Sequence, residues 1–392
     1  MSERRSVREI LVELKDTASY VVSLAYASLL SRDIELAREV IELENEVRDL
    51  RDDLFEAILL AARSARRRGE VRSLTTLLEV GYVSMQIANV AADIAKLAIT
   101  GGPLPLYLVK ALKEAEIVTG IATVSSRSKL VGRKISELFN PPVLSGCDIL
   151  AIRRGRTWIF DYDADEVIEA GDQLLLKGTA KGVKEASAAL GGEVVVQGPL
   201  GMVDVPVIRN ILRRMKDTSE SMIELAYTAL IYDSIEIARE VIKLEEQMDR
   251  LYTQFEREVL RVAGADLASS LPPALRVAIA SENIADAAAS LAELVIDKVT
   301  AHPVLKLVFK EAEETAILAR VRHGSYLDGK SITDSGVEEK SGMRVVAVKR
   351  GRRWAVNPPS NYVIRGGDLI VAVGMPEGAK VLLSMVEGRG SA

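Results

Sequence analysis

The chain of 392 residues contains an internal duplication. Residues 15–44 return without a gap as residues 216–245, and sixteen of these thirty positions are identical. A second block, residues 145–158, returns as residues 341–354. Repeats of this length indicate that both halves of the chain are built from the same units. The repeat is also an internal control, because a charged residue kept in one copy and lost in the other is not required by the fold.

Each half begins with apolar residues at helical spacing and ends with alternating ones, which predicts long helices followed by short strands. The expected helical segments are residues 6–100 interrupted at Gly69, with a long helix over 73–99, then 106–116, 183–190, 207–262, 273–299, 303–314 and 377–386. The expected strands are residues 117–124, 149–152, 157–160, 173–176, 316–321, 344–348, 353–356 and 369–373.

This order predicts an α+β multidomain protein. Two helical domains, residues 1–104 and 200–302, alternate with two α/β sandwich domains, residues 105–194 and 303–390. Trp158 and its counterpart Trp354 are expected to anchor the core or an interface, because large aromatic side chains dominate such contacts.

The charge balance argues against a nucleic-acid partner. The net charge is −5, whereas a general nucleic-acid binder has a basic balance or a clear basic face. The one basic cluster, Arg63 with residues 66–68, falls at the end of an expected helix. Cations there suit the helix dipole and cap the last carbonyls, and we interpret the cluster in that way.

Several classes of protein are excluded by what the sequence lacks. No uncharged stretch reaches the ~18–20 residues that span a bilayer, and charges interrupt the start of the chain, so we expect a cytoplasmic protein without membrane insertion. Cys147 is the only cysteine and His302 and His323 are the only histidines. Internal disulfides, catalytic triads and multi-histidine zinc sites are therefore not expected, and the chain is not expected to be an enzyme.

Carboxylates one helical turn apart mark a candidate metal site in the second half: Glu245 with Asp249, and Glu282 with Asp286. Such pairs repel each other by about a few tenths of a kcal/mol, a cost that a hard divalent cation would remove. The alternative is the solvated acidic face of an amphipathic helix, and both interpretations stay open. The corresponding residues of the first half are Glu44 with Arg48, and Met85 with Asn89.

Turn residues of the β-rich domains are candidates for ligand binding. Arg154 and Arg350, at the two hairpins, can hold a phosphate bidentately or lie as ordinary solvated surface, and both interpretations stay open. Four glycines are expected to adopt positive φ at turns: Gly132, Gly171, Gly329 and Gly367.

Motifs around these turns carry a family resemblance. They read LVGRKI at residues 130–135 and EAGDQL at 169–174 in the first copy, and LDGKSI at 327–332 and RGGDL at 365–369 in the second. Each β-rich domain thereby resembles the C-terminal regulatory domain of potassium-transport proteins, the TrkA-C or RCK C-terminal domain. Through residues 34–47 and 235–248, the helical domains resemble the three-helix half of PhoU proteins.

The resemblance implies a non-catalytic regulator of a potassium channel or transporter, working as a homodimer. RCK C-terminal domains bind small anionic ligands, in some bacteria cyclic di-AMP, between paired domains. A ligand cleft of this kind would be lined by Arg133, Ile135, Lys330 and Ile332, with Arg154 and Arg350 at the hairpins. The glycine-rich fingerprint of dinucleotide-binding domains is missing, so nicotinamide binding is not carried over.

The helical resemblance supports an alternative. PhoU proteins carry paired acidic motifs that hold metal ions, which implies a divalent cation at Glu245, Asp249, Glu282 and Asp286. The protein would then be a metal-binding adaptor in phosphate or ion homeostasis, and its β-rich domains would serve only dimerisation.

Overall fold

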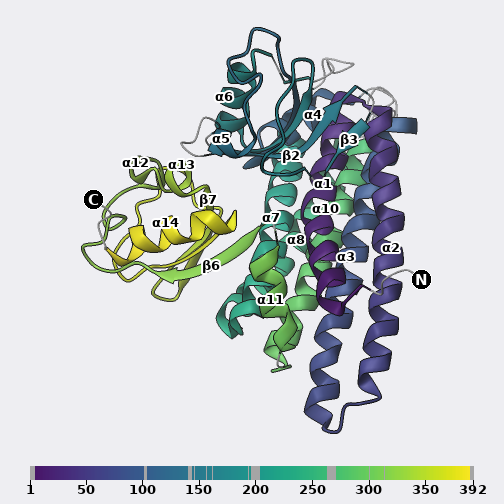
Figure 1. The fold of residues 1–392 in the computed structure, drawn as a ribbon, viewed down its shortest axis with the longest axis vertical. Helices are drawn as coiled ribbons and strands as arrows, with labels where there is room; N and C mark the ends of the chain where they lie inside the picture. Colours follow the sequence, from purple (N-terminus) through teal and green to yellow (C-terminus); the bar gives the residue numbers. More distant parts are fainter. Residues whose placement is uncertain are drawn as a thin grey trace.

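The computed structural model describes residues 5–388 apart from 101–103, 140–143, 145, 156, 161, 193, 196–203, 263–270, 300 and 313. Helical and β-rich segments alternate along the chain, as the sequence predicts. The long helices form one elongated body, with the first β unit at its upper end and the second at its side (Figure 1). Within the described residues, no helix is both long and apolar enough to cross a bilayer.

The first helical unit consists of α1 (Val7–Ser31), α2 (Ile34–Ala62) and α3 (Arg68–Thr100). α1 ends at Arg32, whose φ of 53° is left-handed, and the Asp33 side chain then caps α2 by accepting from the Leu36 N–H. The sequence pattern does not predict this break, because left-handed helix ends usually carry glycine. The expected interruption near Gly69 is present but lies at residues 63–67, since Gly69 itself is in the first turn of α3.

The second helical unit repeats this design with α7 (Pro206–Tyr232), α8 (Ile235–Val262) and α10 (Leu271–Ile296). The single helix expected over residues 207–262 is therefore two helices. Asp233, with a φ of 50°, is the left-handed residue between them and occupies the same place as Arg32. Side chains of both helical units belong to one continuous hydrophobic core, in which α10 packs against α3 as well as against α7 and α8.

The first β unit is an antiparallel sheet with strand order β3-β2-β4-β1-β5. Gly132 and Gly171 adopt positive φ at its turns, as predicted. The strands are β1 (Ile117–Thr123), β2 (Cys147–Arg154), β3 (Thr157–Ile159), β4 (Gln173–Thr179) and β5 (Val194–Val195). The accompanying helices are α4 (Leu106–Lys113), α5 (Ser136–Phe139) and α6 (Ala180–Leu190).

The second β unit has the corresponding antiparallel order β6-β9-β7-β8. Gly329 and Gly367 take positive φ, so all four glycine predictions are confirmed. The strands are β6 (Thr315–Arg320), β7 (Met343–Arg350), β8 (Arg353–Val356) and β9 (Leu369–Gly374). The accompanying helices are α11 (Pro303–Glu311), α12 (Ile332–Ser335), α13 (Val337–Ser341) and α14 (Pro376–Glu387).

Both faces of each sheet are covered, because successive residues of a strand point to opposite sides. In β4, Leu174 and Leu176 belong to the core that the sheet forms with its own small helices, whereas Leu175 joins the core of the helical body. β9 behaves alike, with Val371 facing the helical body. Each β unit is thus docked on the long helices through one face of its sheet.

The arginine cluster does not lie where the sequence places it. Arg63 follows the end of α2, as expected, but α3 already begins at Arg68. Residues 66–68 therefore sit at the N-terminus of a helix, where cations oppose the helix dipole. The interpretation of the whole cluster as a helix C-terminal cap is wrong for these three residues.

Candidate functional site

Charged side chains gather where the two sheets meet α1 and α7, and we call this region the junction. Lys15 and Lys216 are each only 4% exposed, which is unusual for lysine. The junction comprises Lys15, Asp148, Lys177, Lys216, Asp217, Glu220, Glu224, Glu314 and Arg344.

Two lysines link each helical unit to the β unit of the other half. Lys216 Nζ, on α7, donates to the Ile117 carbonyl at 2.8 Å, where β1 begins. Lys15 Nζ, on α1, donates to the Glu314 carbonyl at 2.7 Å, immediately before β6. Strand pairing makes Ile117 and Glu314 equivalent, because the residues after them pair with Gly178 and Gly374, the corresponding glycines of β4 and β9. The junction therefore contains a reciprocal exchange between the halves.

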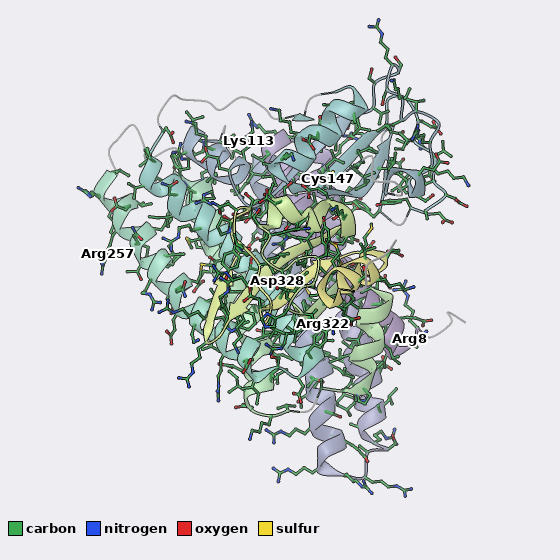
Figure 2. The ribbon with its side chains drawn as sticks, turned by 90° about the vertical axis from the view of Figure 1, so that its left-hand side faces the viewer. Arg8, Lys113, Cys147, Arg257, Arg322 and Asp328 are labelled. Atoms are coloured by element: carbon green, nitrogen blue, oxygen red, sulfur yellow. The ribbon has the colours of Figure 1, made fainter. Side chains whose placement is uncertain are left out.

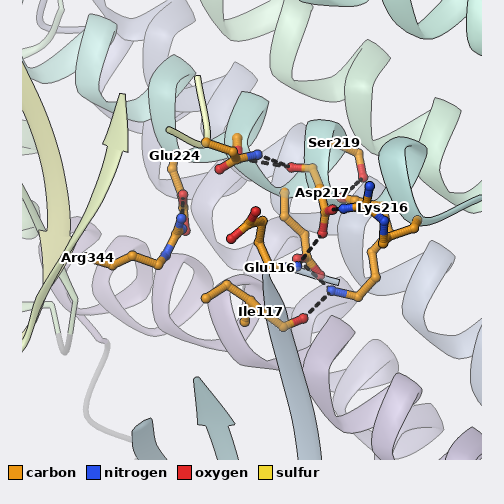
Figure 3. A network of polar contacts seen from close by, with 11 residues as sticks. Glu116, Ile117, Lys216, Asp217, Ser219, Glu224 and Arg344 are labelled. Carbon is orange, nitrogen blue, oxygen red and sulfur yellow. Dashed lines mark hydrogen bonds and ion pairs between the residues drawn. The ribbon is translucent and has the colours of Figure 1, made fainter. Parts of the chain in front are cut away.

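The Asp217 carboxylate makes a second hydrogen bond between α7 and the start of β1. It accepts the Glu116 N–H at 2.8 Å, next to the carbonyl that Lys216 holds (Figure 3). Lys216 Nζ also lies 2.8 Å from a Glu220 oxygen, one helical turn further along. Burial raises the pKa of Asp217 to about 6, although Lys216 lowers it.

Each β unit is also fastened to the helices of its own half. In the first half, Arg153 pairs with Asp33 at 2.6 Å and with Glu35, both at the start of α2. In the second half, Lys349 pairs with Glu236 at the start of α8. Both cations also lie over the nearby tryptophan. Trp158 belongs to the core of the helical body and Trp354 packs against it, as expected for residues that anchor the core or an interface. Every β unit is thus held by both helical units.

The two β units are joined directly by a partly buried ion pair. Lys177 Nζ on β4 lies 3.2 Å from Glu314 Oε1. Burial disfavours the charge on Glu314, but Lys177 and Lys15 outweigh it and hold its pKa below the ordinary value. Close by, Arg344 on β7 pairs with Glu224 on α7 (Figure 3). Charges removed from water need such partners, so the units cannot separate here without leaving charges unpaired.

Charged residues of the junction line two cavities. One, of about 90 Å³, lies between the helices and both sheets and is lined by Lys15, Lys177, Glu220 and Glu314 among apolar residues. The other, of about 240 Å³, lies between the two β units. Its wall includes Glu116 and Thr179 of the first unit, and Ile332, Glu338 and Arg344 of the second.

Asp148 on β2 is the most perturbed carboxylate of the junction. Burial and, to a smaller extent, the nearby charge of Glu314 raise its pKa to about 7, while Lys177 opposes the change. The corresponding position of the second unit is Arg344. Asp148 is consequently poised to exchange a proton near neutral pH.

The hairpin arginines bind within their own units. Arg154 Nε and Nη2 donate to the two carboxylate oxygens of Asp172 at 3.0 and 2.9 Å. Arg350 makes the equivalent pair with Asp368 at 2.9 and 2.6 Å. Both aspartates are 2% exposed, so each needs its arginine, and a phosphate would have to compete with them.

The remaining ligand candidates divide by exposure. Arg133 is exposed, and Lys330 lies 3.4 Å from the centroid of the Tyr326 ring. Ile135 is buried in the core of the first unit. Ile332 is buried as well, in the second unit, where it contributes to the wall of the larger cavity. Of these four candidates, only Ile332 lines either of the two cavities described above.

The acidic pairs of the second half face each other across α8 and α10. The pKa of Glu282 is raised by partial burial and by Asp286, Asp249 and Glu245. Burial and Asp249 likewise raise the pKa of Asp286. Within the described part of the chain, however, no three or more His, Cys, Asp or Glu side chains converge closely enough to hold a metal ion.

Sequence reasoning missed the junction, because its contacts join residues about a hundred or more positions apart. A signal was nevertheless present. Lys15-Asp16-Thr17 returns unchanged as Lys216-Asp217-Thr218, although the three residues on either side of it differ between the copies. A charged pair that both copies keep while its neighbours change indicates a contact that the shared fold uses.

Comparison with known families adds to this geometry. The PhoU domain family matches residues 11–98 and 212–295. The TrkA-C domain family matches residues 121–191 and 317–386. Both families therefore occur in two copies, in the order that the sequence motifs indicate.

Two channel proteins of Methanocaldococcus jannaschii are similar to part of the chain. Potassium channel protein 1 is 44% identical over 62 residues, which are 16% of this chain and 19% of that protein. Probable potassium channel protein 2 is 28% identical over 85 residues, 21% of this chain and 25% of that protein. The chain thus spans about a fifth to a quarter of the length of these relatives.

Two solved structures show weaker similarity. PhoU from Pseudomonas aeruginosa aligns over 74% of this chain and 93% of its own, with 15% identity and a TM-score of 0.40. The GsuK RCK domain aligns over 79% of both chains, with 12% identity and a TM-score of 0.18.

Proposed function

Since this chain contains two PhoU domains and two TrkA-C domains, we propose that it is a non-catalytic regulator of potassium transport. A small anionic ligand, with cyclic di-AMP as the first candidate, would bind the TrkA-C units and alter how the protein acts on a potassium channel or transporter. The potassium channel proteins that resemble part of the chain support this direction.

The observation that carries the proposal is the junction. Lys15 and Lys216 tie each helical unit to the β unit of the other half, and Lys177 ties the β units to each other. Breaking one partner of a buried ion pair is costly, so a shift of either β unit has to be accommodated by both helical units. This is the mechanical connection that a ligand-responsive regulator needs between its sensing and its acting parts.

Within the TrkA-C units we propose that Arg133 and Lys330 make the first contact with the ligand. They stand beside the positive-φ glycines Gly132 and Gly329, and cations at such turns are open to an anion. Arg154 and Arg350 would keep the turns in shape through Asp172 and Asp368. Ile135 and Ile332 would support the same turns from the core. In the proposed homodimer, a second copy of the chain would complete the cleft. Light scattering with and without ligand tests this by measuring the mass of the complex.

Thermal unfolding with cyclic di-AMP tests the ligand. A ligand at a hundred times its dissociation constant stabilises the folded chain by about 2.7 kcal/mol. We expect Arg133→Gln with Lys330→Gln to abolish that increase, and the exposed control pair Arg352→Gln with Arg353→Gln to keep it. An increase that survives in the first double variant would place the ligand elsewhere.

Rubidium uptake tests the connection to potassium transport. Cells of the source organism that lack this chain should differ in uptake rate from cells that carry it, and the wild-type chain should restore the rate. An unchanged rate under both low and high external potassium would contradict the proposal, whatever the ligand result.

A metal-binding adaptor of the PhoU type is the second candidate. It is favoured by the mutual repulsion of Glu245, Asp249, Glu282 and Asp286, which a divalent cation would relieve. Calorimetry with Mg²⁺, Mn²⁺ and Ca²⁺ should then give heat that Glu282→Gln with Asp286→Asn removes. Glu44→Gln in the first half serves as the matched control.

A further inference from the structure

The tip of the α2–α3 hairpin, residues 59–72, combines exposed apolar side chains with concentrated positive charge. Leu59, Leu60 and Val71 are 67%, 46% and 45% exposed. The segment holds five arginines and one glutamate, in a chain whose net charge is −5. The arginines are Arg63, Arg66, Arg67, Arg68 and Arg72.

The fold does not account for Arg66, Arg67 and Arg68. Among the described residues no ion pair involves Arg63 or residues 66–68, and residues 66–68 oppose the dipole of α3. Arg72 reaches only the Asp297 carbonyl, at 3.4 Å. The second half offers an internal control, because its sequence between α8 and α10, residues 263–270, contains no arginine. An arginine-rich connection is therefore not needed to join two such helices.

The tip is also free to reach a partner. α2 and α3 continue past the other helices at the lower end of the molecule, far from both β units (Figure 1). Seen from the side, the α2–α3 hairpin points downward, whereas Arg257, near the end of α8, lies at the left-hand edge (Figure 2). The two hairpin ends thus point in different directions, and a surface that meets one does not meet the other.

We propose that this tip docks the protein peripherally onto a lipid bilayer that contains anionic headgroups. The arginines would contact the headgroups, and Leu59, Leu60 and Val71 would enter the boundary between headgroups and acyl chains. The rest of the chain is net negative and would be repelled, so docking would orient the molecule with its hairpin toward the membrane and its β units away from it.

A bilayer fits the tip better than the other polyanions of a cell. The segment contains no aromatic residue on which a nucleic-acid base could stack, and it contains three exposed aliphatic side chains that RNA would leave unburied. A helical hairpin end is convex, and a fluid surface adapts to such a shape without a matching groove.

Vesicle flotation with the full-length protein tests the proposal. The protein should float with vesicles of phosphatidylglycerol and phosphatidylcholine, should not float with phosphatidylcholine alone, and should dissociate as salt is raised. Each arginine at an anionic surface contributes about fivefold to binding, so Arg66→Ser with Arg67→Ser and Arg68→Ser should weaken it roughly a hundredfold. Replacing the same three by lysine should preserve most of it, because charge is retained.

Two further variants distinguish binding through the tip from nonspecific adsorption to vesicles. Leu59→Ser with Leu60→Ser should reduce binding at equal charge, whereas Arg257→Ser with Leu260→Ser and Arg261→Ser, at the other hairpin, should leave it unchanged. All changes are at exposed positions, and unfolding curves verify that each variant is folded. Equal flotation with neutral vesicles, an equal loss from the second hairpin, or arginine-dependent binding to poly-uridine RNA without flotation would each overturn the proposal.

Discussion

The helical units of the two halves share one fold but differ in the charges on the face between their last two helices. In the first half, Glu44 is 8% exposed and pairs with Arg48, and the facing position holds the buried Met85. In the second half, Glu245 and Glu282 face each other, each with an aspartate one turn away.

This difference separates what the fold requires from what it tolerates. Lys15 and Lys216 are present in both halves and make the same contact, so the junction belongs to the architecture. The acidic face and the arginine tip each occur in one half only. Features present in one copy only are not needed for the shared fold, so they are the places to look for functions that the two halves do not share.

The largest expected loss of stability comes from removing either of the two equivalent lysines of the junction. Lys216→Met leaves the Ile117 carbonyl and Glu220 without their buried donor, and Lys15→Met does the same to the Glu314 carbonyl. We expect each change to lower the free energy of unfolding by roughly 3 kcal/mol. Urea unfolding followed by circular dichroism measures this loss, and Lys243→Met, at an exposed pair with Glu240, should cost less than about 0.5 kcal/mol. A loss in only one of the two buried variants would show that the exchange is not reciprocal.

The hairpin arginines should behave alike in both halves. Arg154→Ala and Arg350→Ala each leave a buried aspartate without its bidentate partner, and we expect a loss of about 2 kcal/mol in either case. Lysine should rescue little, because it cannot match both carboxylate oxygens. If instead ligand binding is lost while the thermal midpoint stays unchanged, these arginines serve the ligand rather than the turn.

Asp148 should make the free energy of unfolding depend on pH. Only the first half contributes this effect, because Arg344 occupies the corresponding position of the second half. Its pKa is raised to about 7 by burial, so the folded state holds this proton more tightly than the unfolded state does. The resulting stabilisation is complete below the ordinary carboxyl value and is lost as pH rises through 7. Wild type should therefore lose about 1–2 kcal/mol between pH 5 and 8 that Asp148→Asn does not lose. The exposed Asp53→Asn is the control, and an identical pH profile for all three proteins would contradict the assignment.

The sequence predicts most elements of this fold because local patterns determine them. Every expected strand is present, and the positive-φ glycines are correct, since turns depend on neighbouring residues. The helix breaks at Arg32 and Asp233 escaped prediction because neither residue is a glycine. The junction escaped it because Lys216 and Ile117, or Lys15 and Glu314, meet only after the chain has folded back across the other half.

The smallest expected effect on stability concerns the acidic residues between α8 and α10. Partial burial and mutual repulsion raise the pKa of Glu282 and Asp286, so their ionisation costs stability as pH rises through the raised values. Neutralising both, by Glu282→Gln with Asp286→Asn, should stabilise the protein by a few tenths of a kcal/mol at pH 7 and leave it unchanged at low pH. Glu44→Gln should have the opposite sign, because it removes the partner of Arg48.

Added Mg²⁺ then tests whether the repelling carboxylates of α8 and α10 bind a metal ion. A cation held between α8 and α10 should raise the thermal midpoint of wild type and of Glu44→Gln, but not that of the neutralised variant. If Mg²⁺ changes none of the three midpoints, the second half carries an ordinary solvated acidic face. Its difference from the first half would then reflect only what the shared fold tolerates at this surface.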